Sequence, residues 1–159
     1  MTAEDRDAIA FVAAFGAQWP FWTANLLHIK NETPKPGKER GGAFAGLIQK
    51  QRRMGTRKGV SDYFLAVPIG EFHGLFLELK AEGGTVKPEQ VAFLEEMRER
   101  GYAAACAWTW TCAMTVASRY MDGKLSRRGV LGCSPTAPFP VVLSALTMGG
   151  KVRTRRIEK

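Results

Sequence analysis

The chain has 159 residues, of which 45% are hydrophobic, and it carries a formal net charge of +8. This length and composition predict one globular domain with extensions, large enough to bury a sizeable core. No apolar run approaches the roughly 18 residues that a membrane span needs, and the acidic start MTAEDRDA does not resemble a secretory signal. We therefore expect a cytoplasmic protein (in the host-cell cytoplasm if the chain is viral).

The first half of the chain alternates between helical and extended patterns. Apolar spacing with early acidic residues predicts a helix over 4–15. A short strand over 24–29 follows, then a Pro/Gly/Lys loop over 35–42 and a helix over 43–53 with basic residues on its exposed side.

A hairpin is predicted next, with strands over 62–67 and 74–80 that turn through Pro68, Ile69 and Gly70. The second strand reads GLFLELK, so its three leucines alternate with Phe76, Glu78 and Lys80. Because a strand points successive side chains to opposite faces, the leucines share one face and Glu78 and Lys80 share the other.

The later elements complete an α/β pattern. Pro88 opens a helix that runs to about 100, a compact apolar strand over 102–108 lies beside the Glu78 strand, and Thr111 caps a helix to about 121. This order predicts a mixed central sheet with helices on both faces. The segment 122–159 is rich in glycine and proline, and we interpret it as a loop-rich basic extension in which 141–146 is a strand or a short helix.

Chemistry is predicted where the two hairpin strands meet. Asp62 and Glu78 place two carboxylates on neighbouring strands, which repel each other unless a cation lies between them. Mg²⁺ prefers oxygen ligands and keeps several waters, and the carbonyl of Leu79 offers a third oxygen. Lys80 would donate to the attacking hydroxide or to the phosphate, and Gln90 would position these groups. The set predicts metal-assisted hydrolysis of a phosphodiester, against the plainer alternative of a solvated strand face with a cross-strand ion pair.

The positive charge is clustered in two blocks, over 35–58 and 151–159. Such clusters favour salt-dependent contact with a phosphate backbone, although a solvated charge run is the alternative, above all for the tail. The predicted DNA contacts are Lys35, Lys38, Arg40, Lys50, Arg52, Arg53, Arg57, Lys58, Lys151, Arg153, Arg155 and Arg156.

The ordered set G-V-x-D at 59–62, E-L-K at 78–80 and P-E-Q at 88–90 resembles the virus-type replication-repair nuclease (VRR-NUC) family of the PD-(D/E)-x-K superfamily, over about 27–121. The resemblance implies a restriction-endonuclease-like αβββαβα core within a nuclease domain over 1–121. It also implies a Mg²⁺- or Mn²⁺-dependent DNA nuclease. Ser61 stands where the family usually has proline.

The resemblance also assigns residues. The catalytic core would be Asp62, Glu78 and Lys80, with Gln90 at the start of the following helix and Glu32 as an accessory acid. The superfamily often has an acidic residue in its first helix, where Glu4, Asp5 and Asp7 are all available.

Small stand-alone members of the family suggest Holliday-junction resolution, in DNA repair and recombination, by a homodimer that makes two symmetric cuts. One alternative is a nuclease acting on flap, single-stranded or unspecific duplex DNA. Another is a basic DNA-binding module without hydrolysis, which leaves the arrangement of Asp62, Glu78 and Lys80 as coincidence.

Overall fold

The computed structural model describes residues 1–30 and 41–143, of which 41–44 and 137–142 are described by their backbone alone; 31–40 and 144–159 are not described. The elements in chain order are α1 (Ala3–Gln18), the 3-10 helix η1 (Pro20–Asn25), β1 (Leu26–His28), α2 (Gly41–Arg53), β2 (Tyr63–Leu65), β3 (Leu75–Lys80), α3 (Pro88–Glu99), β4 (Ala103–Trp108), α4 (Trp110–Met121), β5 (Leu131–Ser134) and β6 (Ala137–Val142). This order confirms the predicted α/β class.

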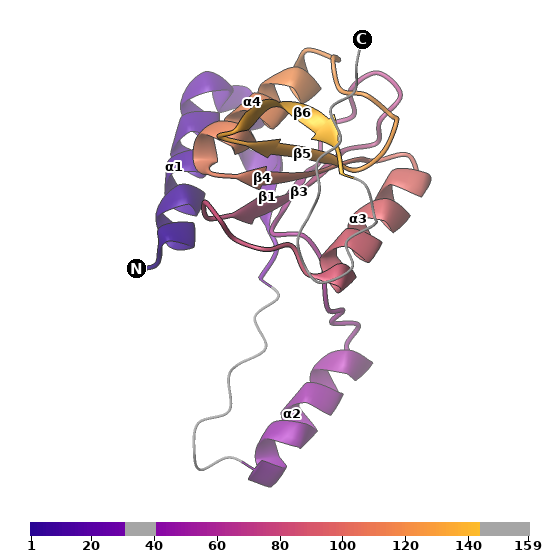
Figure 1. Ribbon diagram of the computed structural model, residues 1–159. Helices are drawn as coiled ribbons and strands as arrows, with labels where there is room; N and C mark the ends of the chain where they lie inside the picture. The colour runs from indigo at the N-terminus through magenta and orange to yellow at the C-terminus, as the bar shows by residue number, and fades with distance from the viewer. Residues whose placement is uncertain (31–40, 144–159) are drawn as a thin grey trace.

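The six strands form one mixed sheet whose spatial order follows the chain order. Strands β3, β4 and β5 are parallel, whereas the pairs β1–β2, β2–β3 and β5–β6 are antiparallel. The parallel crossover from β3 to β4 runs through α3, and the crossover from β4 to β5 runs through α4. The two helices lie on opposite sides of the sheet (Figure 1), because α4 packs with one of the two clusters of buried residues and α3 packs with the other.

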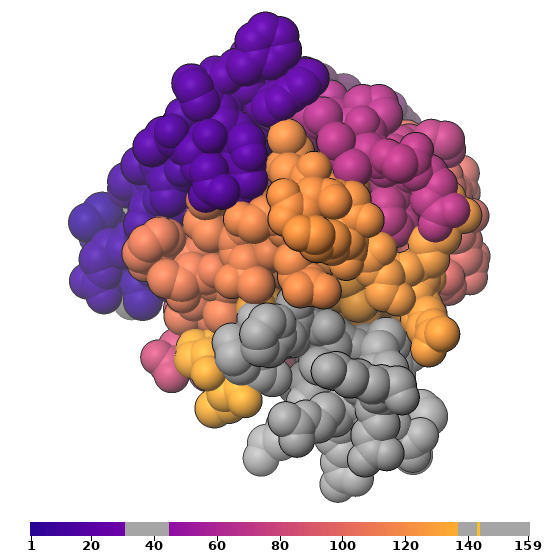
Figure 2. Space-filling view, turned by 90° about the horizontal axis from the view of Figure 1, so that it is seen from above, coloured from indigo at the N-terminus to yellow at the C-terminus, as the bar shows by residue number. Residues whose placement is uncertain are grey.

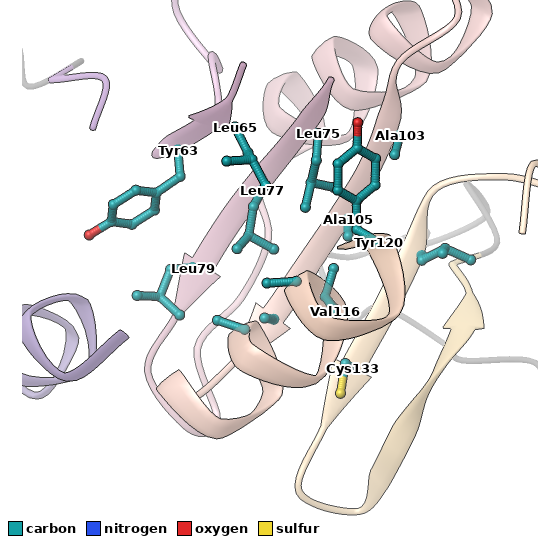
Figure 3. Packing of buried hydrophobic residues seen from close by; sticks show 14 of the residues in the cluster. Tyr63, Leu65, Leu75, Leu77, Leu79, Ala103, Ala105, Val116, Tyr120 and Cys133 are labelled. Carbon is teal, nitrogen blue, oxygen red and sulfur yellow. The ribbon is translucent and has the colours of Figure 1, made fainter. Parts of the chain in front are cut away.

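One face of the sheet carries the larger core. The side chains of Leu75, Leu77 and Leu79 are each at most 2% exposed, which confirms the predicted leucine face. They pack against Val116 and Tyr120 of α4 (Figure 3). Helix α1 lies beside α4 over the same face (Figure 2). The alternating strand pattern therefore sends its leucines under two helices and turns Glu78 to the other side.

The opposite face is covered by α3. Leu94 and Phe93 of this helix are buried against Cys106 and Trp108 of β4. Glu78 belongs to this face because it alternates with the buried leucines of β3. The first turn of α3 thus begins close to the carboxyl end of β3, where the predicted site lies.

Two local expectations are corrected. Thr109, not Thr111, caps α4: its hydroxyl accepts from the N–H of Cys112, and it is the one residue between β4 and the helix. The loop-rich segment after 122 contributes a strand that was not predicted, because β5 pairs with β4 and buries Leu131 and Cys133 in the core, whereas β6 overlaps the strand or short helix expected over 141–146. Short strands interrupted by glycine and proline acquire their pairing from the neighbouring sheet rather than from their own pattern.

Helix α2 stands away from the sheet and the other helices (Figure 1). The exposed side chains of Lys50, Arg52 and Arg53 lie in its last turn. None of the described helices is both long and apolar enough to cross a membrane.

Candidate active site

The carboxylate of Asp62 is tied to the neighbouring strand. Its Oδ2 accepts a hydrogen bond from the backbone N–H of Leu79 at 2.9 Å. The residue before it, Ser61, is fully buried, and its hydroxyl donates to the carbonyl of Tyr63 at 3.3 Å. This bond holds the approach to β2 immediately before Asp62. Burial raises the pKa of Asp62 above its ordinary value, although the Leu79 bond and the Lys80 charge oppose the shift.

Glu78 is the centre of the site. Its side chain is fully buried. Its Oε1 accepts from the ammonium of Lys80 and from the side-chain amide of Gln90, whereas its Oε2 has no hydrogen-bond partner among the described residues. Burial and the nearby charge of Asp62 raise the pKa of Glu78 to about 8. A buried oxygen without a partner is costly, so this atom indicates a group that the protein alone does not supply.

Lys80 connects three oxygens of the site. Besides Glu78, its Nζ lies 3.3 Å from the carbonyl oxygen of Leu79 and 3.4 Å from Oε1 of Glu4. Burial disfavours the ammonium, but the charges of Glu78, Asp62 and Glu4 outweigh that effect and raise the pKa of Lys80. The raised pKa favours the ammonium form of Lys80, which can donate hydrogen bonds.

Gln90 reaches Glu78 from the first turn of α3. While its amide nitrogen donates to Glu78, its Oε1 accepts from the backbone N–H of Lys87 at 2.9 Å. The start of α3 lies against the loop before β2, at Gly59. This residue has φ +79°, and a Cβ added to it would collide with the carbonyl oxygen of Glu89. The glycine of the G-V-x-D motif therefore allows the loop before Asp62 to lie against the turn that carries Gln90.

The first helix contributes one acid. Glu4 reaches Lys80, and its charge raises the pKa of Asp62. Asp5 instead closes a capping box with Thr2, and Oδ1 of Asp7 accepts from the backbone N–H of Trp110 at 3.1 Å. The structure therefore distinguishes Glu4 from the other two. Glu32 lies outside the described residues.

The donor set suits a hard divalent cation. Within the described ranges, no three His, Cys, Asp or Glu side chains form a ready-made cluster of metal ligands. Asp62, the unpartnered Oε2 of Glu78 and the carbonyl of Leu79 nevertheless bring two carboxylates and one backbone oxygen to one place. Mg²⁺ is commonly bound through one or two carboxylates and keeps several waters, so this sparse set fits it.

The predicted DNA contacts are only partly described. Lys50, Arg52, Arg53 and Lys58 are exposed. Arg57 pairs with Glu96, and its guanidinium lies over the ring of Phe93 at 5.7 Å from the centroid. The other predicted contacts lie outside the described residues; they are Lys35, Lys38, Arg40, Lys151, Arg153, Arg155 and Arg156.

Comparison with known proteins gives a likeness to a solved structure. No family model and no curated protein matches the chain. A solved structure named "VRR_NUC domain protein" is 21% identical, with a TM-score of 0.63, and the match covers 77% of this chain and 90% of that one. The predicted resemblance is therefore confirmed at the level of the fold: the chain has the mixed α/β architecture of a VRR_NUC domain protein.

Proposed function

We propose that this protein is a divalent-metal-dependent DNA endonuclease that hydrolyses phosphodiester bonds. The observation that carries the proposal is the buried Glu78, with one oxygen unpartnered among the described residues, beside Asp62 and the ammonium of Lys80. A fold shared with a VRR_NUC domain protein supports it. A buried ion pair with a purely structural role is expected to have hydrogen-bond partners for both oxygens of Glu78.

The proposed roles follow from the contacts. Asp62, Glu78 and the carbonyl of Leu79 would hold Mg²⁺ or Mn²⁺, which supplies positive charge at the phosphate and lowers the pKa of water. Lys80, as a cation, would donate to a phosphate oxygen as negative charge builds up there. Gln90 would hold Glu78 in place, and Glu4 would hold Lys80.

The overall reaction is a balanced hydrolysis. The oxygen of one water bonds to phosphorus, and the bond from phosphorus to one sugar oxygen breaks. The proton that the water loses is balanced by the proton that the leaving oxygen gains. Because Lys80 is already protonated, it stabilises charge rather than accepting the proton of the water.

We further propose that the protein acts on branched DNA as a homodimer. Ile9 and Val12 on α1 and Leu27 on the edge strand β1 are 61%, 40% and 48% exposed. Ile9 and Val12 line a groove with His28 and Tyr63. An apolar surface of this kind supports self-association, and two sites related by a two-fold axis suit two symmetric cuts in a four-way junction.

Cleavage of labelled DNA tests the proposal. Wild type should cut in Mg²⁺ and stop in EDTA, while Asp62→Asn and Glu78→Gln should lose at least about 100-fold in rate. Glu89→Gln is the matched control, because Glu89 is an exposed neighbour of Gln90 in α3. Equal cleavage by wild type and the two site variants would exclude the proposed site. Cleavage rates on four-way junctions, flaps and plain duplex test the preference for junctions. The molecular mass in solution tests the homodimer.

A further inference from the structure

Trp110 lies next to the candidate site in a position that the proposed chemistry leaves unused. It is the first residue of α4, and Thr109 alone separates it from β4, the strand that pairs with β3. The N–H of the preceding residue, Thr109, donates to the carbonyl of Lys80 at 3.0 Å. Trp110 therefore stands at the carboxyl ends of the parallel strands, the edge where α/β sheets bind their ligands.

The indole of Trp110 is unlike the other three in the chain. Trp108 is 9% exposed and its Nε1 donates to the carbonyl of Gly84, and Trp19 and Trp22 pack against the core. Trp110 is 38% exposed, and in the described part of the chain its ring has neither an aromatic neighbour nor a hydrogen bond from its Nε1. The Trp110 side chain is thus partly accessible to a ligand.

The backbone at this position is held firmly. The N–H of Trp110 donates to Asp7 of α1, and Glu4, one helical turn before Asp7, contacts Lys80. The same face of α1 therefore fixes Trp110 and the site lysine together. Thr109 has φ +104°, a conformation that a β-branched residue rarely adopts. The turn is held against this strain by its bonds to Lys80 and to Cys112.

We propose that Trp110 stacks on an unpaired base beside the scissile phosphate. An accessible indole on a rigid support, one residue from the backbone bond to Lys80, matches the way aromatic side chains bind single-stranded nucleic acid. The preferred substrate is then DNA with at least one unstacked nucleotide next to the cut, rather than continuous duplex. This inference rests on the proposed nuclease function and narrows its substrate.

The test measures binding in the Asp62→Asn background with Mg²⁺, so that hydrolysis does not interfere. The probes are a continuous duplex and the same duplex with a single-strand bulge containing 2-aminopurine. Trp110→Ala and Trp110→Leu should weaken binding of the bulged probe by about 5- to 100-fold. They should change binding of the continuous duplex by less than about twofold, because phosphate contacts dominate there. Trp110→Phe should retain most of the affinity.

Fluorescence gives an independent readout. The bulged probe should quench tryptophan emission in the background protein but not in Trp110→Phe, which keeps an aromatic ring without the indole signal. Phe21→Ala is the control, because Phe21 is 81% exposed but belongs to η1 rather than to the carboxyl ends of the parallel strands. Thermal melts establish that each variant folds. If Trp110→Ala fails to fold, the Leu and Phe variants and the quenching still decide the question.

Three results would overturn the inference: equal weakening on both probes, no weakening on either, or a loss of self-association in Trp110→Ala without DNA. The last would assign the indole to an interface between copies. Failure of the proposed function looks different, because wild type would then cut no DNA in Mg²⁺ whatever residue 110 is. Metal-dependent cleavage with no effect of Trp110 on the bulged probe rejects this inference alone.

Discussion

The side-chain amide of Gln90 joins the buried carboxylate of Glu78 to the first turn of α3. Its nitrogen donates to Oε1 of Glu78, and its oxygen accepts from the N–H of Lys87. One side chain thus caps a helix and fixes the orientation of an acid on the central strand. The amide itself does not titrate, so the protonation of Glu78 is what can change this link with pH.

Replacing Gln90 should separate these two roles. Gln90→Ala removes both bonds, so we expect a cleavage rate lowered by about 10-fold or more and a melting temperature lowered by a few degrees. Gln90→Glu places a like charge beside Glu78, which raises the pKa of Glu78 further and should move the acid limb of the pH–rate profile upward. Rates across a pH series check this. A Gln90→Glu profile that coincides with wild type would contradict the assigned contact.

The stability of the metal-free protein should depend on pH through the titration of Glu78. The folded pKa of about 8 lies above the ordinary 4.5, so the folded state holds an extra proton between these values. The contribution of Glu78 to the free energy of unfolding is therefore lost as pH rises through that window. Glu78→Gln has no such proton, so its melting temperature should exceed that of wild type by a growing amount toward pH 8. Taking the difference between the two proteins cancels the other titrating groups.

A divalent metal should reverse the difference in melting temperature between wild type and Glu78→Gln. Mg²⁺ favours the ionised carboxylate and binds the folded wild-type protein, which stabilises it by mass action. The melting temperature of wild type should therefore rise with added Mg²⁺ at pH 8, while that of Glu78→Gln stays nearly constant. Equal responses of the two proteins would place the metal elsewhere.

Some of this arrangement was predictable from local pattern. The alternation in 74–80 identifies the buried face of β3, and therefore the face of Glu78 and Lys80, because side-chain direction in a strand depends only on position. A different signal, the uninterrupted apolar run over 102–108, predicted the strand found at Ala103–Trp108, and such a run suits a parallel strand buried on both faces.

Other parts depend on tertiary contacts that no local pattern encodes. Three acids share the start of α1, and only the docking of that helix brings Glu4 rather than Asp5 to Lys80. Thr109 as a cap requires a positive φ that its side chain disfavours, so the pattern pointed to Thr111 instead. Strand β5 contains Gly132, a poor strand former that is tolerated because Leu143 fills the space above it.

The hydroxyl of Tyr120 offers a test of the core that is separate from the site. It donates to the carbonyl of Val67 at 2.5 Å, and both residues are at most 2% exposed. Tyr120→Phe leaves a buried carbonyl without its donor and should cost about 1–2 kcal/mol, which lowers the melting temperature by about 2–8 °C. Tyr102→Phe is the control, because Tyr102 is half-buried and its hydroxyl has no hydrogen-bond partner within the described ranges.

The first-turn acids of α1 make the sharpest comparison. Glu4 contacts Lys80 and its charge contributes to the raised pKa of Asp62. Glu4→Gln should therefore slow cleavage by about 10-fold and move the acid limb of the pH–rate profile to lower pH, because a nearby negative charge is removed.

Asp5→Asn provides the matched change one residue away. The carboxylate of Asp5 accepts from the N–H of Thr2 at 2.7 Å as part of the capping box, so its loss should lower thermal stability by a degree or more. The pH–rate profile of Asp5→Asn should match wild type, because the Asp5 side chain bonds to the helix start rather than to Lys80. A shifted profile in Asp5→Asn and an unchanged one in Glu4→Gln would mean that α1 docks with a different face toward the site.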